Sequence, residues 1–526
     1  MKPRFDLFLA AAAALALPGA LTAAPAELPA HRVVIVVFDG MRPDFISPAT
    51  TPNLARLAAD GVYFAHHHPV YLSSTEVNGT AIATGMYPAH STVVANSEFR
   101  PRIDPQQPVP LEATATIRKG DEVSGGHYLA TPTIAELLQA QGWPTAIAGS
   151  KPVALLHDRQ PRADGPGVSP VLHEGEAMPP SVGSDLQEAL GDFPAIAADQ
   201  DKVDRDAWTT AALIHTLWKD PLPVYSLLWL AEPDFSQHAT GPGSAQSLAV
   251  IAHSDADLGR LLAELDHRGL RATTDVLVVS DHGFSTFGTR VDVAAELSRA
   301  GFATGRAALG GLAPGHVLVI NRGGSSLLYV GGHDPKVVRE VAGVLQTKPW
   351  AAVLFAREAI EGTFPLSAAH IDSPEAPDLV LALQWTRGPS ANGTPGVETC
   401  DGAPSGKKSS GHEGLCPYDM HNTLVAAGPD FRRGFMDQTP SGNTDLAPTA
   451  LWILGLHEAA TRMDGRVLSE ALTVPGPAET APETRRLEAK RSWSGGSWSQ
   501  YLQVSEVNGV RYLDEGSGHA AGAPAP

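Results

Sequence analysis

Six acidic and imidazole side chains lie just after, or beside, apolar stretches of the sequence. They are Asp39, Asp234, His238, Asp281, His282 and His412. Mixed oxygen and nitrogen donors of this kind suit divalent ions of intermediate hardness, zinc above all. Two such ions about 4 Å apart can clamp an in-line displacement at phosphorus. Each residue alone has an ordinary alternative, a cap or turn for Asp and a structural role for His, so the hypothesis depends on all six converging.

A hydroxyl group that could act as the nucleophile lies in the stretch 69–88. An apolar lead-in ends at Ser73, Ser74 and Thr75, and small residues with helical spacing follow. The start of a helix carries unpaired backbone N–H groups, whose field favours an oxygen nucleophile that attacks a negatively charged group. Ser and Thr are also common N-caps. Thr75 is therefore a candidate nucleophile because of the six residues above, and Ser74 is the first alternative.

Apolar stretches typical of buried strands alternate with stretches of helical periodicity along most of the chain. Strands are expected at 32–38, 144–149, 224–232, 275–280, 327–330, 351–355, 378–383 and 422–427. Helices are expected at 51–61, 131–142, 207–218, 244–268, 336–345 and 445–456. This alternation predicts an α/β fold whose sheet is covered by helices on both faces. The six residues would then meet at one sheet edge, where the C-terminal ends of parallel strands face a ligand crevice.

The composition predicts three segments. Residues 1–26 have the features of a secretory signal peptide, because Lys2 and Arg4 precede a short apolar run and Ala-rich cleavage options follow. A retained N-terminal anchor is the alternative. Residues 30–474 would form the catalytic domain, with long loops or a small inserted lobe at about 100–130 and 157–200. Residues 475–526 would form a linker and a small β appendage, with a hairpin turn at Asn508 and Gly509.

The signal peptide predicts export to the periplasm or the extracellular space. No later stretch is long and apolar enough to span a membrane, so no stable membrane insertion is expected. Cys400 and Cys416 are the only cysteines, and in an oxidising compartment they are expected to form a disulfide. The run of His66, His67 and His68 is expected in a solvent-facing loop. The oligomeric state stays open.

The chain is acidic, with a formal net charge of −19 at pH 7. This charge disfavours binding of a nucleic-acid duplex through a basic surface. A small-molecule phosphoester would have to be attracted by local positive charge, such as that of bound metal.

Several short motifs occur in a characteristic order. They are Phe38-Asp39-Gly40, Thr51-Pro52-Asn53-Leu54, Thr84-Gly85-Met86-Tyr87-Pro88, the stretch 232–238, Ser280-Asp281-His282-Gly283, Gly411-His412 and Asp464-Gly465-Arg466. They span about residues 32–470, and the chain resembles the alkaline phosphatase superfamily in its nucleotide pyrophosphatase/phosphodiesterase branch. The resemblance implies an alkaline-phosphatase-like fold, with a central, mostly parallel sheet between helices. It also implies a phosphoester hydrolase with two Zn²⁺ per chain.

The resemblance assigns a role to each matching residue. Asp234, His238 and His412 resemble the ligands of one zinc. The other zinc would be bound by Asp39, Asp281, His282 and Thr75, with Thr75 as the nucleophile that forms a phospho-threonine intermediate. Asn96 matches an asparagine that donates to a non-bridging phosphate oxygen. Asn78 is expected to support the turn that carries the nucleophile.

The sequence also departs from the pattern of the branch. Phosphodiesterases of the branch often have an aromatic residue after the nucleophile that stacks on a nucleobase, and here that residue is Glu76. Lys151 resembles the lysine of phosphomonoesterase relatives, which carry a Lys and an Arg for the extra phosphate charge, but the Arg position is Val153. Lys151 could equally be an ordinary surface lysine.

Three functions therefore stay open. The leading hypothesis is a phosphodiesterase or nucleotide pyrophosphatase, and the second is a phosphomonoesterase on the same site. A sulfatase is disfavoured, because no Cys or Ser stands in a Cys/Ser-x-Pro-x-Arg setting around Thr75. A non-catalytic ligand-binding protein on a hydrolase scaffold is the remote alternative.

Overall fold

Nine strands of the described residues form the central sheet, in the order β22-β2-β21-β10-β1-β9-β6-β7-β8, in which the first two are β22 (Phe435–Asp437) and β2 (Val62–Phe64). The computed structural model describes residues 28–522, apart from 166–167, 198–199, 221, 404–405 and 407. The five neighbours in the middle of the sheet are parallel: β10 (Thr274–Val279), β1 (Arg32–Phe38), β9 (Tyr225–Leu230), β6 (Thr145–Gly149) and β7 (Val171–His173). Antiparallel strands flank them, β21 (Leu424–Ala427) beside β10 and β8 (Glu176–Met178) beside β7. The predicted α/β fold with a mostly parallel sheet is confirmed.

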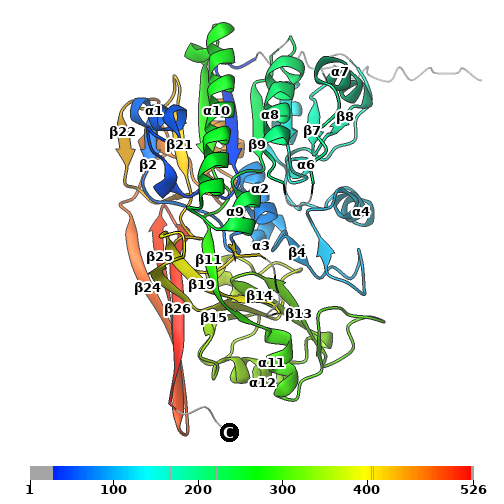
Figure 1. Ribbon diagram of the computed structural model, residues 1–526, viewed down its shortest axis with the longest axis vertical. Coiled ribbons are helices and arrows are strands. Elements are labelled where there is room, and N and C mark those ends of the chain that lie inside the picture. Colours follow the sequence, from blue (N-terminus) through cyan, green and yellow to red (C-terminus); the bar gives the residue numbers. More distant parts are fainter. Residues whose placement is uncertain are drawn as a thin grey trace, which may run out of the picture.

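Strand β1 shows why the sheet is covered on both faces. Alternate side chains of a strand point to opposite faces, and here both sets are apolar and buried, so Val33, Ile35 and Val37 enter one core and Val34, Val36 and Phe38 the other. The helices that contribute to the first core include α2 (Thr75–Thr84), α5 (Ile134–Gln139) and α13 (Leu446–Ile453). Those that contribute to the second core include α1 (Pro52–Asp60) and the long α10 (Ala245–His267). Figure 1 shows this α/β half as the upper part of the molecule.

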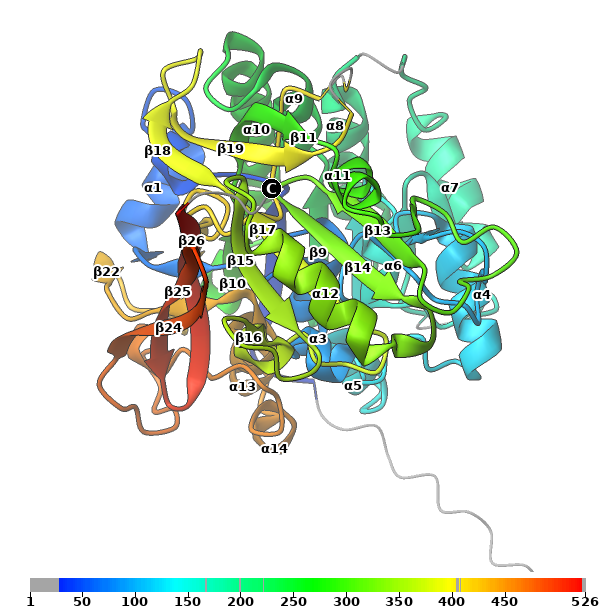
Figure 2. The same cartoon turned by 90° about the horizontal axis from the view of Figure 1, so that it is seen from below.

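A second layer lies below the central sheet and is made largely from residues 285–411 (Figures 1 and 2). A six-stranded sheet has the order β12-β13-β14-β17-β15-β16, in which β12 is Thr304–Gly305, β13 is Val317–Arg322 and β16 is Phe364–Pro365. A four-stranded sheet has the order β18-β19-β11-β20, which are Trp385–Pro389, Pro395–Asp401, Ser285–Val291 and Ser410–Gly411. Apolar faces of α11 (Val293–Arg299) and α12 (Pro335–Leu345) pack on the six-stranded sheet. The strands expected between residues 327 and 383 are present as β14 (Ser325–Val330), β15 (Ala351–Ala356) and β17 (Leu379–Leu383), but they form this separate sheet rather than extend the central one.

The segments expected as loops or an inserted lobe contain regular structure. Residues 100–130 include α4 (Thr114–Ser124), and residues 157–200 include β7, β8 and α7 (Pro180–Leu190). Strand β7 pairs in parallel with β6, so this part of the chain adds an edge to the central sheet.

The last strands form an antiparallel three-stranded sheet along one side of the molecule, drawn in red in Figures 1 and 2: β24 (Glu483–Trp493), β25 (Gly496–Val507) and β26 (Val510–Gly522). The expected hairpin turn at Asn508 and Gly509 joins β25 to β26. Val507 and Tyr512 pack in the core of the upper half and Leu502 in that of the lower half, so the sheet spans both.

Two features anchor β26 to the rest of the chain. The Tyr512 hydroxyl donates to Asp445 Oδ2 at 2.8 Å, and Asp445 in turn accepts from the Gly442 backbone N–H at 2.8 Å. His68 Nε2 lies 3.0 Å from Asp514 Oδ1.

The proposed signal peptide at 1–26 lies outside the described residues. Within the described part of the chain, no helix combines the length and the apolar character needed to cross a membrane.

The predicted Cys400–Cys416 disulfide is wrong, because both cysteines are free and buried. Cys400 lies in β19 (Pro395–Asp401), where its Sγ accepts from Arg290 Nη1 at 3.4 Å. Cys416 lies beyond β20, where burial and then the Asp419 carboxylate raise the pKa of its thiol well above the usual value. Burial also raises the pKa of the Cys400 thiol, so both thiols are held in the unreactive protonated form.

We expect two free thiols per chain on titration with 5,5′-dithiobis(2-nitrobenzoate) after unfolding without reductant. The native protein should react slowly, because both side chains are at most 1% exposed. A titration that finds no thiol in the unfolded, unreduced protein would restore the disulfide.

Candidate active site

Three carboxylates meet at the C-terminal edge of the central sheet. Asp39 follows β1 and Asp281 follows β10, and since these strands are parallel neighbours, the two residues emerge side by side. The Gly40 N–H donates to Asp281 Oδ1 at 2.9 Å, and the Asp234 N–H donates to the Asp39 carbonyl at 2.9 Å. All three side chains are buried. The convergence predicted from the strand ends is therefore present.

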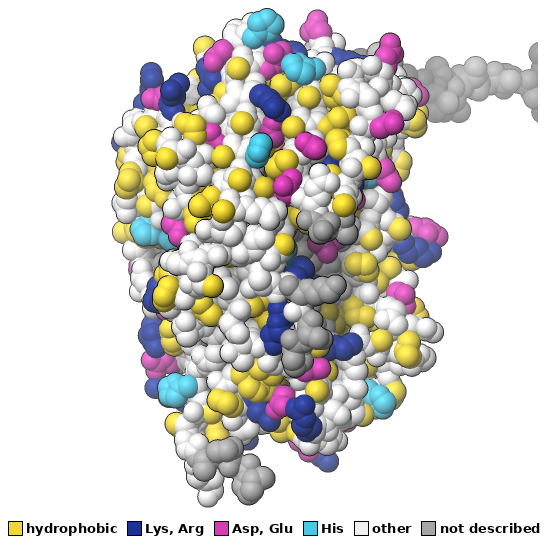
Figure 3. Space-filling model, viewed as in Figure 1, with side chains coloured by type: hydrophobic (Ala, Val, Ile, Leu, Met, Phe, Trp, Pro, Cys, Tyr) yellow, Lys and Arg dark blue, Asp and Glu magenta, His cyan; other side chains and the backbone are white. Residues whose placement is uncertain are grey.

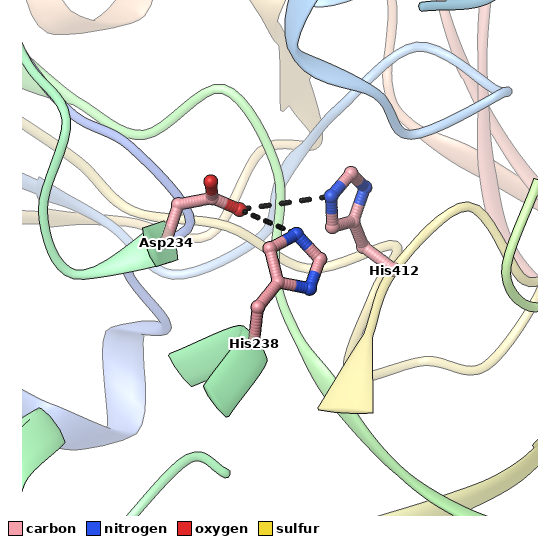
Figure 4. Close-up of side chains that lie close together, drawn as sticks. All are labelled: Asp234, His238 and His412. Atoms are coloured by element: carbon pink, nitrogen blue, oxygen red, sulfur yellow. Dashed lines mark ion pairs between the residues drawn. The ribbon is translucent and has the colours of Figure 1, made fainter. Parts of the chain in front are cut away.

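Three histidines surround these carboxylates. Asp234 starts α9 (Asp234–Thr240) and His238 lies one turn further on, so both side chains share one face of the helix. His412 comes from a distant segment, directly after β20 (Ser410–Gly411). Asp234 Oδ1 lies 3.3 Å from His238 Nε2 and 3.6 Å from His412 Nε2 (Figure 4). His282 Nε2 lies 3.3 Å from Asp281 Oδ2 and 3.6 Å from Asp39 Oδ1.

Backbone carbonyls orient all three imidazole rings in the same way. The Nδ1–H of His238 donates to the Ser410 carbonyl at 3.0 Å, that of His282 to the Gly283 carbonyl at 2.8 Å, and that of His412 to the Ser73 carbonyl at 2.7 Å. With Nδ1–H donated in this way, Nε2 is the ring nitrogen that faces the carboxylates and can offer a lone pair to a cation. Burial, and then the neighbouring His282, lower the pKa of His412 well below its usual value, which keeps this ring neutral.

The carboxylates keep one oxygen each without a hydrogen-bond partner among the described residues. These atoms are Asp39 Oδ1, Asp234 Oδ1 and Asp281 Oδ2. Lys151 is the cation in contact with them, with its Nζ 2.8 Å from Asp39 Oδ2 and 3.1 Å from Asp234 Oδ2. Burial, and then the Asp281 charge, raise the pKa of Asp39 well above its usual value. Three buried acids beside one ammonium, with three imidazole lone pairs, form a donor set that fits divalent cations.

The ligand atoms form two groups that share Asp234. One contains Asp234, His238 and His412, and the other contains Asp39, Asp234 and His282. The resemblance had assigned Asp234 to the first alone and Asp281 to the second. A third group, His31, Asp275 and Asp430, lies at the opposite edge of the sheet, where β1 and β10 begin, and does not belong to this site.

Thr75 is the first residue of α2 and faces the same cluster. Its Oγ1 lies 3.4 Å from His282 Nε2, which is the position expected for a nucleophile beside the Asp39–His282 group. Ser74 is the N-cap residue of the helix, and its buried Oγ has no hydrogen-bond partner among the described residues. All ten residues of α2 are buried, so the helix holds Thr75 in a fixed place.

Two asparagines lie beside the turn that carries Thr75. Asn78 Oδ1 accepts from the Val70 N–H at 2.7 Å, and its Nδ2 donates to the Ser74 carbonyl at 3.1 Å, so it supports the turn before Thr75. Asn96 Oδ1 accepts from the Glu76 N–H at 2.8 Å. Its Nδ2 is therefore the end left to donate, and Asn96 lines the same cavity as Thr75.

Two supporting residues were missed by the sequence reasoning. Asn443 donates from Nδ2 to Asn78 Oδ1 at 2.9 Å and to the Asp281 carbonyl at 2.7 Å, so it joins the nucleophile turn to a carboxylate loop. Trp229 donates from Nε1 to Asp39 Oδ2 at 2.8 Å. A signal existed for Trp229, because an indole N–H in a buried strand needs an acceptor. No sequence signal pointed to Asn443.

The histidine run is only partly exposed. His66 is exposed, but His67 and His68 are buried in β3, so the expected solvent-facing loop is wrong for both. His67 Nε2 donates to Asn443 Oδ1 at 2.9 Å, and burial lowers the pKa of His67 to about 3. It is a structural histidine that holds Asn443.

The structure answers the questions left open about Lys151, Val153 and Glu76. Lys151 is no surface lysine, since it contacts two site carboxylates. Val153 is fully buried and packs against Gly79 in α2, where a charged side chain would not fit. Glu76 is buried, and burial raises its pKa well above the usual value.

A cavity of about 440 Å³ opens onto the site. Thr75, Asn96, Asp234, His238 and His412 line one end of it. Side chains of the second layer line the rest, among them Phe287, Arg290, Asn321 and Arg322. A small ligand can therefore reach Thr75 and extend towards the second layer.

Known proteins resemble this chain over much of its length. A model of the type I phosphodiesterase / nucleotide pyrophosphatase family matches residues 33–394. Mouse bis(5′-adenosyl)-triphosphatase enpp4 is 23% identical over 439 residues, which cover 81% of this chain and 78% of that protein. Mouse ectonucleotide pyrophosphatase/phosphodiesterase family member 7 is 24% identical over 273 residues, which cover 51% of this chain and 53% of that protein.

Solved structures share the fold. Murine ectonucleotide pyrophosphatase/phosphodiesterase 5 is 18% identical, with a TM-score of 0.56, and the match covers 80% of this chain and 95% of that one. An inactive variant of that protein, in complex with AMP, matches with a TM-score of 0.55. Since the family match extends over well over half of the chain, the chain belongs to the type I phosphodiesterase / nucleotide pyrophosphatase family, within the alkaline phosphatase superfamily.

Proposed function

We propose that this protein is a two-zinc phosphodiesterase of the nucleotide pyrophosphatase type, in which Thr75 is the nucleophile. The observation that carries the proposal is the meeting of three carboxylate oxygens without partners and three imidazole Nε2 atoms beside Thr75 Oγ1. One zinc would be bound by Asp234, His238 and His412, and the other by Asp39, Asp281, His282 and Thr75. Bound zinc would lower the pKa of the Thr75 hydroxyl and stabilise the leaving oxygen.

The residues of the chain support a two-step displacement. Thr75 Oγ1 releases its proton to solvent and forms a bond to phosphorus, while the bond from phosphorus to the leaving oxygen breaks. The leaving group departs with the bonding electrons as an oxyanion that solvent can protonate, which gives a phospho-threonine and the first product. Asn96 Nδ2 donates to a non-bridging oxygen. Water then attacks the phospho-threonine, restores the Thr75 hydroxyl and releases the second product. The start of α2 adds a positive field at Thr75 throughout.

The substrate is a small phosphoester. A diester carries one negative charge fewer than a fully ionised monoester, and Val153 offers no cation for the additional charge. The names of relatives point to nucleotides: mouse enpp4 is a bis(5′-adenosyl)-triphosphatase, and a related structure holds AMP. The buried Glu76 gives no stacking surface after the nucleophile, so a panel of nucleotides, phospholipid head groups and phosphosugars is needed to find the best substrate.

The organisation of the chain completes the proposal. Residues 1–26 would direct export to the periplasm or the extracellular space, and residues 30–474 would form the catalytic domain. Residues 475–526 would form a linker and the β appendage, of which the structure describes β24–β26.

Thr75→Ala should abolish turnover of bis(p-nitrophenyl) phosphate and leave two zinc ions per chain. The change deletes the nucleophile and only one of seven proposed ligands. Metal content by plasma mass spectrometry and the unfolding temperature serve as controls. Activity within about tenfold of wild type would contradict the role of Thr75 and direct attention to Ser74.

The stereochemistry at phosphorus tests the covalent intermediate. Two displacements should retain the configuration of a chiral phosphorothioate diester, because each one inverts it. Net inversion would exclude the phospho-threonine while leaving the metal site in place.

A phosphomonoesterase is the second candidate, and the ammonium of Lys151 at the site favours it. Lys151→Met keeps the length of the side chain and removes its charge. We expect kcat/KM for p-nitrophenyl phosphate and for its bis-ester to fall by a similar factor, roughly tenfold or more, because Asp39 and Asp234 serve both reactions. A loss confined to the monoester would favour the phosphomonoesterase.

A further inference from the structure

The cavity at Thr75 has a second, basic wall that the proposed reaction does not use. This wall contains Arg290, Asn321, Arg322 and Lys408, with Phe287 between them and the catalytic end. Phe287 packs against Gly411, the residue before His412. The basic wall therefore lies on the side of the cavity where His238 and His412 are. Figure 3 shows dark-blue Lys and Arg side chains gathered at mid-height on one face of the molecule.

Arg322 and the carboxylates next to the wall are neutralised within the protein. Arg322 forms a two-pronged ion pair with Glu413 through Nε and Nη2. Asp401 is occupied by Arg306 and by the Ser326 hydroxyl.

Arg290, like the exposed Lys408, has no such partner among the described residues. No ion pair to Arg290 occurs among the described residues; its guanidinium donates to the Lys408 carbonyl and to Cys400 Sγ. Glu112, the remaining acid of the lining, interacts with Glu76 and Arg322. A cation without a carboxylate partner, inside a protein of net charge −19, is a local site for an anion.

Arg290 is also held in place before any ligand arrives. Its guanidinium carbon lies 5.5 Å from the centre of the Phe287 ring. Gly406 lies so close that an added Cβ would be 2.6 Å from Nη1. Because these contacts fix the side chain, binding an anion costs less conformational entropy than it would for a free surface arginine. The planar fork of Arg suits the paired oxygens of phosphate and carboxylate.

We propose that Arg290, assisted by Asn321, binds a second anionic group, a phosphate or a carboxylate, on the leaving group of the substrate. This inference rests on the proposed function, because an in-line displacement places the leaving group opposite the nucleophile. Thr75 approaches from the side of His282, so the leaving group extends past His238 and His412 towards Arg290. The substrates that fit best carry charge at both ends of the broken bond.

Three substrates with the same retained methyl phosphate test the proposal. They are 4-nitrophenyl methyl phosphate, 3-carboxy-4-nitrophenyl methyl phosphate and methyl diphosphate, whose leaving groups carry no further anion, a carboxylate and a phosphate. The variant is Arg290→Gln, with Arg290→Lys to keep the charge. The matched control is Lys336→Gln, which removes one positive charge from α12 on a surface that does not line the cavity. Each enzyme is assayed as the metal-loaded full chain.

Relative to the first substrate, Arg290→Gln should lower kcat/KM for an anionic leaving group by about tenfold, as expected for loss of a charge-assisted hydrogen bond. Arg290→Lys should keep part of the preference, and Lys336→Gln should change nothing. Whichever of the two anionic substrates loses more identifies the group that Arg290 binds. Equal losses on all three substrates would overturn the proposal, since Arg290 would then support the fold or a shared step.

Two further measurements test the proposal without relying on turnover by Arg290→Gln: one uses only the wild type, and the other measures binding rather than turnover. The ratio of kcat/KM for an anionic leaving group to kcat/KM for the first substrate should decrease in the wild type as salt rises from about 0.05 to about 0.5 M, because ions screen a partly exposed charge. In the Thr75→Ala background, calorimetry should show tighter binding of the carboxylated substrate than of the first one, and Arg290→Gln should remove the difference. A wild type that hydrolyses all three without preference refutes this inference alone, whereas failure to hydrolyse any of them refutes the proposed function.

Discussion

Three buried carboxylates at one sheet edge impose the main electrostatic demand on this structure. Asp39, Asp234 and Asp281 would repel one another strongly in so small a space, and the single ammonium of Lys151 offsets only part of that charge. The three histidines point their Nε2 atoms at the same place, and burial lowers the pKa of His412, so that this ring adds a lone pair rather than charge. The folded protein is therefore arranged to gain stability from cations at this place, and metal binding and folding should be linked.

The second layer is more than a cover over the site. His412 belongs to a loop whose next residue, Glu413, is bound by Arg322 of β13 (Val317–Arg322), and the Glu413 N–H donates to Ser73 Oγ at 3.0 Å. The layer thus fixes the imidazole of His412, a proposed metal ligand, against the turn that carries Thr75. Strands of the same layer supply the basic wall of the cavity, so the part of the protein that positions His412 also shapes the space proposed for the leaving group.

Much of the candidate site could be predicted, because the position of several of its residues follows from the sequence immediately around them. A carboxylate directly after an apolar strand must lie at the strand's end, and parallel neighbours bring such ends together, which placed Asp39 and Asp281 without knowledge of the sheet order. Partners across the chain could not be predicted in this way. The apolar pattern of β14, β15 and β17 indicates strands but does not say which strands they pair with, so a separate sheet was not foreseen. His67 lies in the two-residue strand β3 and Asn443 in a three-residue 3-10 helix, and burial of such short elements depends on the packing of segments far apart in sequence.

The C-terminal sheet, β24–β26, is connected by hydrogen bonds to the residues that support the turn before Thr75. Tyr512 holds Asp445, Asp445 holds the backbone of Gly442, and the next residue, Asn443, contacts both Asn78 and Asp281. Ribosomes make a protein from its N-terminus, so Thr75 emerges more than four hundred residues before Tyr512. The proposed nucleophile and all the proposed metal ligands therefore leave the ribosome before the strand that braces Asn443. The proposed site is expected to be aligned only once β26 has been made and has packed against Asp445.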